Sequence, residues 1–219
     1  HHDGDLPART GLGSSSSFTV GMLHALYALK GIMPTKKRLA LEAIHLERNL
    51  LKENVGSQDQ ILAAIGGFNR VDFDPGNENA YRETPILIDA KRIQELQSHM
   101  MLFFTGISRY DSNVAKKKID NIPNNGKQLT TMYQMVEEGV SILTSGGCIT
   151  DFGKLLHESW MLKRELSDGI SSQYIDEIYT AAKGEGAIGG KLLGAGGGGF
   201  MLVFAPPQQH SAIEHKLRD

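Results

Sequence analysis

The feature that most constrains this sequence is a concentration of glycine near its carboxyl end. Nine of the 25 glycines fall within residues 184–199, and residues 194–199 read Gly-Ala-Gly-Gly-Gly-Gly. This segment satisfies the dinucleotide-binding pattern G-x-G-x-x-G, but that pattern must open a helix. Here residues 200–204, Phe-Met-Leu-Val-Phe, have the composition of a strand and follow at once. The sequence therefore argues against a dinucleotide site.

We interpret residues 194–199 as a tight connection between two strands, at residues 191–193 and 200–204. So many glycines in a short connection indicate that a ligand, or the first loop of the chain, approaches the backbone closely. A flexible hairpin is the alternative.

A second glycine loop, near the amino end, precedes a predicted helix. Gly11-Leu12-Gly13 is followed by four serines, and the helix ends near Gly31. Its apolar residues recur at helical spacing: Phe18, Met22, Leu26 and Leu29. The free N–H groups and the positive end of the helix dipole make such a helix start a favourable binding site for phosphate. An ordinary serine-capped helix is the alternative. The Walker A spacing is absent, which excludes a P-loop enzyme.

An acidic residue interrupts the apolar face of the second predicted helix, which Thr35 caps and which runs to about residue 52. Ala40, Ile44 and Leu51 follow the rhythm of a buried face, and Glu47 falls in the same line. A buried carboxylate requires a cation or a strong donor, so Glu47 is a candidate Mg²⁺ ligand or ion-pair partner. The alternative is a glutamate at the edge of the face that reaches water.

A third predicted helix carries a second acid. Ser57 and Gln60 have the spacing of a capping box, and Asp59 lies in the first turn, where the helix dipole alone can explain an acid. Gly56 permits a close backbone approach, so a turn could bring Glu47 and Asp59 together. A metal ligand beside a carboxylate that orients or deprotonates a hydroxyl is what phosphoryl transfer needs. The apolar side of this helix is Ile61, Ala64 and Ile65.

The rest of the chain reads as mixed helix and strand. Residues 66–88 alternate like strands joined by turns, and the later elements are a strand at 100–105 and helices near 93–97, 112–121, 127–143, 151–166 and 172–183. The predicted buried stripe of the longest helix is Leu129, Met132, Val136, Val140 and Leu143. We expect two domains, residues 1–95 and 96–219.

Composition excludes several classes of protein. A net charge of −2 without a dense basic cluster argues against a nucleic-acid partner, and no apolar run is long enough to span a membrane. The single cysteine, Cys148, fits a reducing, cytoplasmic setting, and the scattered histidines do not form a zinc site. Trp160, Lys163 and Arg164 could stack and pair with a sugar phosphate, but core packing and surface charge explain them better. No feature indicates an oligomeric state.

Three segments together resemble the GHMP small-molecule kinases. They are residues 7–16 (Pro-Ala-Arg-Thr-Gly-Leu-Gly-Ser-Ser-Ser), 56–60 (Gly-Ser-Gln-Asp-Gln) and 191–199 (Lys-Leu-Leu-Gly-Ala-Gly-Gly-Gly-Gly). Residues 102–109 (Leu-Phe-Phe-Thr-Gly-Ile-Ser-Arg) look most like the bacterial D-glycero-D-manno-heptose 7-phosphate kinases within that family. The family's opening strands are expected to be absent here, so an activity inferred from the resemblance belongs to the complete protein.

The resemblance implies an α+β GHMP kinase fold. Its amino-terminal domain, here partial, would be ribosomal protein S5 domain 2-like, and its carboxyl-terminal domain would be ferredoxin-like and close the cleft. The implied reaction moves the γ-phosphoryl group of ATP to the anomeric hydroxyl of a heptose 7-phosphate and gives the 1,7-bisphosphate and ADP. The alternatives are a kinase for a fucose- or galactose-like sugar and a non-catalytic sensor of sugar and ATP.

The resemblance also implies roles for particular residues. Ser15 and Glu47 would bind Mg²⁺, and Asp59 would act on the acceptor hydroxyl. The ATP phosphates would lie on the first loop, at Gly11, Leu12, Gly13, Ser14, Ser15 and Ser16. The substrate would be bordered by Arg9, Gly196 and Gly197, with Lys163, Arg164 and Lys191 as further candidates for holding its phosphate.

Overall fold

The computed structural model describes residues 10–74, 76–77, 80–107 and 119–218, which form two compact units. Gly13–Leu87 belongs to the first unit, whereas Thr10–Leu12 and Ile88–Asp219 belong to the second. The predicted division between residues 95 and 96 falls inside a helix, α4, Ala90–Ser98. Most of the helix predicted at 112–121 lies outside the described residues.

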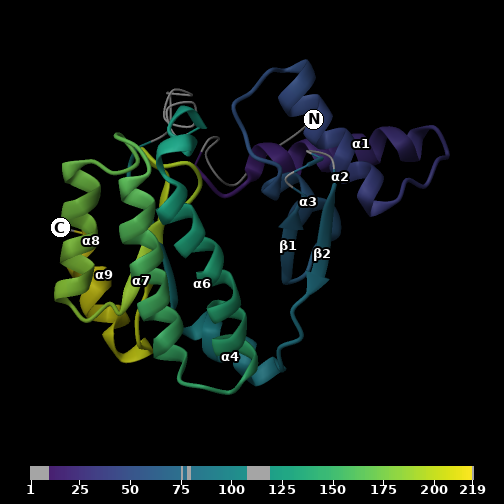
Figure 1. Cartoon of the computed structure of the whole chain (residues 1–219). Coiled ribbons are helices and arrows are strands. Elements are labelled where there is room, and N and C mark those ends of the chain that lie inside the picture. The colour runs from purple at the N-terminus through teal and green to yellow at the C-terminus, as the bar shows by residue number, and fades with distance from the viewer. Residues whose placement is uncertain (1–9, 75, 78–79, 108–118, 219) are drawn as a thin grey trace. The chain divides into compact units, whose positions relative to one another are not determined.

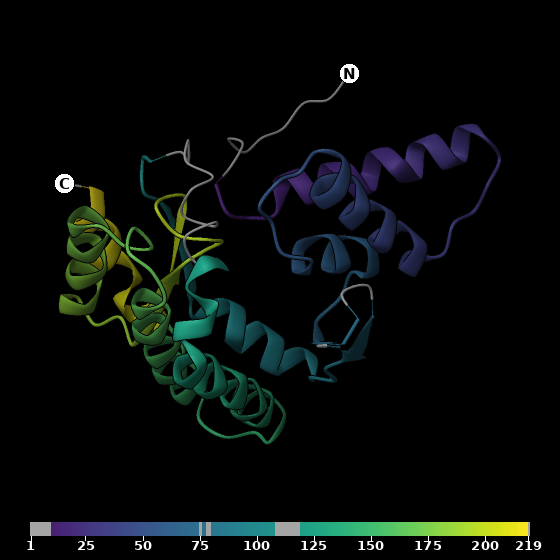
Figure 2. The same ribbon diagram turned by 45° about the horizontal axis from the view of Figure 1, so that its top comes forward.

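Three helices and a hairpin make the first unit (Figures 1 and 2). The helices are α1 (Ser14–Leu29), α2 (Lys36–His45) and α3 (Gln58–Ile65), and each packs against the other two. The antiparallel strands β1 (Asn69–Phe73) and β2 (Tyr81–Pro85) confirm the predicted strand region, with Asn69 opposite Pro85. The buried apolar residues of this first unit are Val20, Leu39, Ala40, Ala43, Ile44, Ile61 and Tyr81.

Helix α1 forms where the apolar spacing predicts a helix, but the face that it buries is not the line of Phe18, Leu26 and Leu29. Phe18 and Leu26 are 43% and 49% exposed, and Leu29 is 84% exposed. Ser16, Thr19 and Val20 are buried instead. The spacing located the helix but not its buried face, because α1 has apolar residues around most of its circumference and the packing of α2 and α3 selects the side that they cover.

The second helix begins as predicted but changes form before it ends. Thr35 accepts a hydrogen bond from the backbone N–H of Arg38 at 3.1 Å, which confirms the cap. After His45 the chain forms a π-helical turn, η1 (Leu46–Leu50), in which the Leu51 N–H reaches the Leu46 carbonyl. A π turn has more residues per turn than an α-helix. Leu51 therefore leaves the buried line and is 60% exposed, contrary to the prediction, while Glu47 stays in it.

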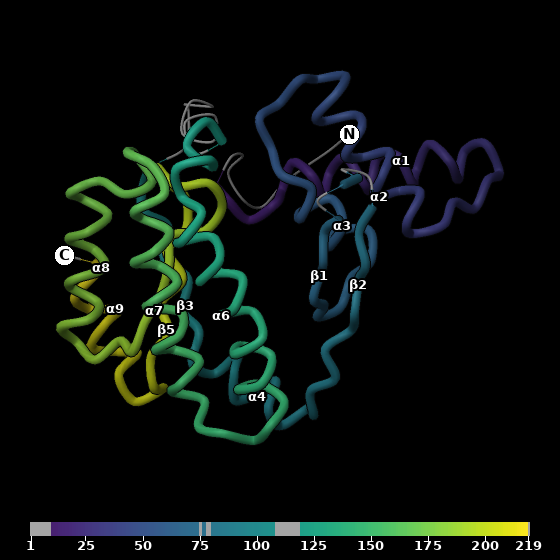
Figure 3. Tube along the Cα trace, viewed as in Figure 1, coloured from purple at the N-terminus to yellow at the C-terminus, as the bar shows by residue number. Residues whose placement is uncertain are grey.

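A three-stranded antiparallel sheet of order β3-β5-β4 is the centre of the second unit (Figure 3). The strands are β3 (Met100–Phe104), β4 (Gly189–Leu192) and β5 (Phe200–Phe204), close to the predicted positions. Phe204, at the end of the middle strand, lies opposite Met100 on one side and Gly189 on the other. The helices that follow α4 are α6 (Gly126–Thr144), α7 (Ile149–Glu165), α8 (Gln173–Gly184) and α9 (His210–Arg218), with short 3₁₀ turns η2 (Ile122–Asn124) and η3 (Pro207–Gln209).

Helix α7 carries the largest side chain of the core in this unit. Trp160 is fully buried, and α7 packs against β4 and α6. The other large, fully buried members of this core come from α8, α9, the loop before α8 and the sheet: Ile170, Ile175, Leu192, Met201, Val203 and Ile213. The sheet thus has a helical cover, as an α+β domain requires.

The buried stripe of α6 is correct except at Val136, which is 44% exposed. Leu129 and Met132 pack against the core and Leu143 is buried. Gly139 takes the central place in the stripe, with Leu155 of α7 within van der Waals reach of the position of its missing Cβ. Because α7 packs on this line, Val136 is turned away from it.

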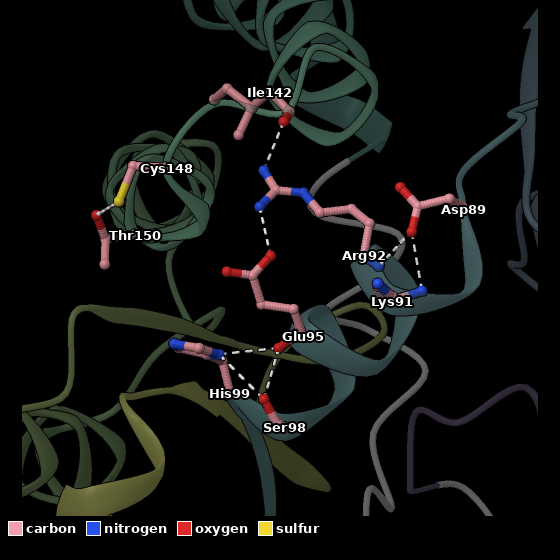
Figure 4. A network of polar contacts seen from close by, with 9 residues as sticks. All are labelled: Asp89, Lys91, Arg92, Glu95, Ser98, His99, Ile142, Cys148 and Thr150. Carbon is pink, nitrogen blue, oxygen red and sulfur yellow. Dashed lines mark hydrogen bonds and ion pairs between the residues drawn. The ribbon is translucent and has the colours of Figure 1, made fainter.

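Helix α4 is held at its amino-terminal end by polar contacts (Figure 4). Asp89 accepts hydrogen bonds from the N–H groups of Lys91 and Arg92, at 2.9 and 3.0 Å, as an N-cap residue does. The Arg92 guanidinium, which is nearly buried, donates to Glu95 and to the Ile142 carbonyl, each at 2.7 Å. Arg92 therefore ties α4 to the last turn of α6.

No helix in the described part of the chain is long and apolar enough to cross a lipid bilayer.

Candidate functional site

The first glycine loop leads into α1 as the sequence predicts. Gly13 is the N-cap residue, in the left-handed conformation with φ 70°, and Ser14 to Ser17 are the first four helical residues. The serine-capped alternative is therefore wrong. Glycine has no side chain with which to cap the helix, and the Ser17 N–H donates to the Gly13 carbonyl at 2.9 Å. The N–H groups of Ser14, Ser15 and Ser16, without a side-chain cap from Gly13, have the position that suits an anion.

Asp59 lies beside the start of α1. A Cβ at Gly13 would lie 3.3 Å from Asp59 Cγ and 3.5 Å from Oδ2. Asp59 is exposed, on the first turn of α3. A carboxylate that water and ligands can reach thus flanks the helix end that favours phosphate.

The predicted capping box at the start of α3 does not form. Ser57 is the N-cap residue, but its side chain makes no cap hydrogen bond and instead accepts from Arg48 at 3.4 Å. The Gln60 side chain is buried inside the unit, where its amide has a hydrogen-bond partner that the sequence did not predict.

That partner is Glu47, which is 1% exposed. Its Oε2 accepts hydrogen bonds from Ser16 Oγ at 3.0 Å and from Gln60 Nε2 at 2.5 Å. Its Oε1 accepts from Thr19 Oγ1 at 2.9 Å. The buried carboxylate thus has the strong donors that its burial requires, and the solvent-reaching alternative is wrong.

The structure does not bring every predicted site residue to Glu47. Ser15 is exposed, whereas Ser16 and Thr19 face the carboxylate, so the role of Ser15 as a metal ligand stays a prediction. Thr19 was missed entirely. The signal that could have found it is helical spacing, because Ser16, Thr19 and Val20 share one face of α1.

The chemistry of the side chains around Glu47 suits the binding of a magnesium ion. They offer a carboxylate and the hydroxyl oxygens of Ser16 and Thr19. Mg²⁺ prefers oxygen ligands and usually combines one or two carboxylates with waters and substrate phosphates. A cluster of three or more His, Cys, Asp or Glu side chains, as in an all-protein metal cage, does not occur in the described ranges.

The second glycine loop packs tightly against neighbouring backbone. The Phe200 N–H donates to the Thr10 carbonyl at 3.1 Å, and the Gly199 carbonyl accepts from the Thr105 hydroxyl at 2.8 Å. The Gly197 N–H donates to the Ile170 carbonyl at 3.0 Å. The flexible-hairpin alternative is therefore wrong, and the predicted approach of the first loop, through Thr10, is confirmed.

The predicted substrate residues in this loop differ in what surrounds them. Gly196 is buried, and Ile170 occupies the space that its Cβ would take, so packing alone explains the glycine. Gly197 is half-buried. A substrate role for either stays a prediction, and Arg9 lies outside the described residues.

The interpretation of Trp160, Lys163 and Arg164 as core packing and surface charge is correct for Trp160, which is fully buried, but wrong for Lys163, which is not at the surface. Lys163 is 7% exposed, and its ammonium donates to the carbonyls of Leu192 and Gly194 at 2.8 and 2.7 Å. Arg164 pairs with Asp176 at 2.7 Å. The Lys163 ammonium therefore fixes the backbone at residues 192–194, where the glycine loop begins.

Substituting Gly199 is expected to destabilise the second unit. Gly199 has φ 102°, and a Cβ there would overlap the backbone carbonyl of Thr10. Backbone strain and overlap together should lower the free energy of unfolding of Gly199→Ala by about 3 kcal/mol. Gly184→Ala, which meets nothing within 4 Å, is the control. Urea unfolding of both variants checks this, and equal stabilities would contradict it.

Comparison with known families agrees with this geometry. A model described as the GHMP kinases N terminal domain matches residues 1–67, and one described as GHMP kinases C terminal matches residues 139–219. The two matches together cover more than half of the chain. The chain belongs to the GHMP kinases. The expected α+β GHMP kinase fold is thereby confirmed.

This GHMP kinase resembles sugar kinases in particular. It is 30% identical over 226 residues to the D-glycero-alpha-D-manno-heptose 7-phosphate kinase of Campylobacter jejuni, across 100% of this chain and 64% of the relative. It is 27% identical over 209 residues to the bifunctional fucokinase/GDP-fucose pyrophosphorylase of Arabidopsis thaliana, across 92% of this chain and 19% of the relative.

The chain is also similar to a sugar kinase of known structure. The crystal structure of a D-glycero-D-manno-heptose 1-phosphate kinase from Bacteroides thetaiotaomicron matches with a TM-score of 0.69 at 25% identity, over 98% of this chain and 59% of that one. This GHMP kinase chain thus spans less than two thirds of the length of each of these relatives.

Proposed function

We propose that the protein containing this chain is an ATP-dependent sugar kinase that phosphorylates the anomeric hydroxyl of D-glycero-D-manno-heptose 7-phosphate. The observation that carries the proposal is the pair of carboxylates beside α1, with exposed Asp59 at Gly13 and buried Glu47 at Ser16 and Thr19. One accessible acid and one immobilised acid next to a phosphate-binding helix start suit phosphoryl transfer.

In this proposal the first loop binds the nucleotide. The backbone N–H groups of Gly11 to Ser16 hold the ATP phosphates, since phosphate oxygens accept from uncapped amides at a helix start. Glu47, with Ser15 as predicted and the Glu47-bonded hydroxyls of Ser16 and Thr19, would hold Mg²⁺. When bound, that ion neutralises charge on the phosphates.

Asp59 acts on the acceptor. Its carboxylate accepts a hydrogen bond from the anomeric hydroxyl and takes the proton as that oxygen bonds to the γ-phosphorus. The bond from the γ-phosphorus to the β,γ-bridging oxygen breaks, and ADP leaves with those electrons. Arg9, Gly196 and Gly197 remain the proposed contacts to the sugar phosphate.

The choice of sugar rests on the relatives. The Campylobacter relative, by its name, acts on a heptose 7-phosphate, which supports that substrate here. The Arabidopsis relative, named in part a fucokinase, supports the second candidate, a fucose-like sugar.

ADP release by the full protein tests the proposal. The protein receives ATP and Mg²⁺ with heptose 7-phosphate, free heptose, fucose or galactose, and a reaction without sugar gives the background. We expect turnover above background on heptose 7-phosphate alone. Turnover on a different sugar would replace the substrate, and tight ATP binding without turnover on any sugar would indicate a sensor.

A further inference from the structure

We propose that Gln60 is a positioning residue that fixes the Glu47 carboxylate for the metal and links it to the turn that carries Asp59. This inference rests on the function proposed above and adds a residue that the sequence reading assigned to a helix cap.

The contact between the two side chains is fully enclosed. Gln60 and Glu47 are each 1% exposed, and Gln60 Nε2 donates to Glu47 Oε2. Because an ionised carboxylate only accepts hydrogen bonds, the amide must face it with its nitrogen. The orientation of Gln60 is thus set by Glu47.

That orientation leaves the other half of the amide unsatisfied. Gln60 Oε1 is buried and has no hydrogen-bond partner in the described part of the chain. An unpaired buried carbonyl opposes folding, and an apolar side chain of similar shape would avoid the penalty. Packing therefore does not account for a glutamine here, whereas its donation to Glu47 does.

The donors divide unequally between the two oxygens of Glu47. Oε2 accepts from both Ser16 and Gln60, while among the described donors Oε1 accepts only from Thr19. A carboxylate oxygen has about two acceptor directions. Oε2 is thus engaged fully, and Oε1 keeps a direction in which to ligate a cation.

Chain geometry extends the effect to Asp59. Gln60 and Asp59 are adjacent in the first turn of α3, with Gln60 buried against Glu47 and Asp59 exposed beside Gly13. A shift of Glu47 relative to Gln60 therefore changes the spacing between the metal ligand and the acid that acts on the acceptor. Gln60 sets that spacing through one hydrogen bond.

The test replaces Gln60 with methionine in the full protein. Gln60→Met keeps the length of the side chain and removes both polar atoms. The lost donation to buried Glu47 lowers the unfolding temperature and the removal of the unpaired carbonyl raises it, so the net fall should not exceed about 5 °C. Loss of a residue that orients a metal ligand typically weakens metal binding by about 10- to 100-fold. We expect a loss of about 10-fold in Mn²⁺ affinity, measured by electron paramagnetic resonance with a non-hydrolysable ATP analogue present.

Gln58→Met is the matched control, because Gln58 lies in the same helix with an exposed side chain. It should bind Mn²⁺ like the wild type. Should Gln60→Met unfold, Gln60→Leu repeats the measurement with a shorter apolar side chain. Mn²⁺ affinity equal to that of wild type in the folded variant, at any unfolding temperature, would mean that Gln60 is purely structural and would overturn the proposal.

The result also separates this inference from the proposed function. If wild type binds Mn²⁺ and turns over a sugar while the Gln60 variants bind Mn²⁺ equally well, only the role of Gln60 fails. If wild type binds no Mn²⁺ with the nucleotide analogue, both the metal site and the role of Gln60 are overturned.

Discussion

Asp59→Asn should lower the turnover number of the full protein by about 10²- to 10⁴-fold, the usual effect of removing a general base. Asparagine has nearly the shape of aspartate and should keep the contact with Gly13, but its amide cannot take the proton of the acceptor hydroxyl. ATP affinity should change by no more than a few-fold. Steady-state ADP release and nucleotide binding by calorimetry measure the two quantities.

The control is Asp74→Asn in the same unit. Asp74 accepts a hydrogen bond from the Gly76 N–H, which asparagine can also accept, so this variant should retain full turnover. If Asp59→Asn turns over at the wild-type rate, Asp59 has no part in the chemistry. A large loss of ATP affinity would instead assign Asp59 to nucleotide binding.

Glu47→Gln should raise the Mg²⁺ concentration needed for half-maximal activity by about 10-fold or more, since the variant loses a charged ligand. It should also lower the free energy of unfolding, by about 1–3 kcal/mol. The amide replaces one accepting oxygen with a donor, and Ser16, Thr19 and Gln60 already surround that position as donors. Mg²⁺ titration of activity and urea unfolding separate the two effects.

Glu42→Gln is the matched control for Glu47. Glu42 lies in α2 and accepts hydrogen bonds from Tyr27 and Arg38, at 2.6 and 2.9 Å, in a half-buried site. Its substitution can reduce stability but should leave the Mg²⁺ requirement unchanged. An unshifted Mg²⁺ titration for Glu47→Gln, with lost stability, would mean that the carboxylate is only structural.

Local patterns predicted most of the fold correctly. Strand composition located β3 and β5, and helical periodicity located α6, α7 and α8 to within a few residues. The glycine loop was recognised as a strand connection packed against other backbone, because only residues without a Cβ allow such an approach. Glu47 was identified as a candidate buried acid because it keeps the spacing of Ala40 and Ile44, and the structure decides for burial over the solvent-reaching alternative.

The sequence-based predictions failed where a residue has more than one possible packing or hydrogen-bond partner. Apolar side chains surround most of α1, so periodicity did not identify its buried face. Gln60 has the spacing of a capping box with Ser57, but its side chain binds Glu47 instead. The spacing of the apolar residues in the second helix does not reveal the π turn that exposes Leu51.

The sequence was sufficient to predict where the chain turns, which segments are helix or strand, and that an acid interrupts the apolar line of the second helix. These follow from side-chain size, backbone freedom and spacing, which are local properties. The surroundings of that acid follow from the tertiary fold, because its donors Ser16, Thr19 and Gln60 lie 31, 28 and 13 residues away in the chain. Hydrogen-bond partners at such separations depend on how α1, α2 and α3 pack, and local sequence does not encode that packing.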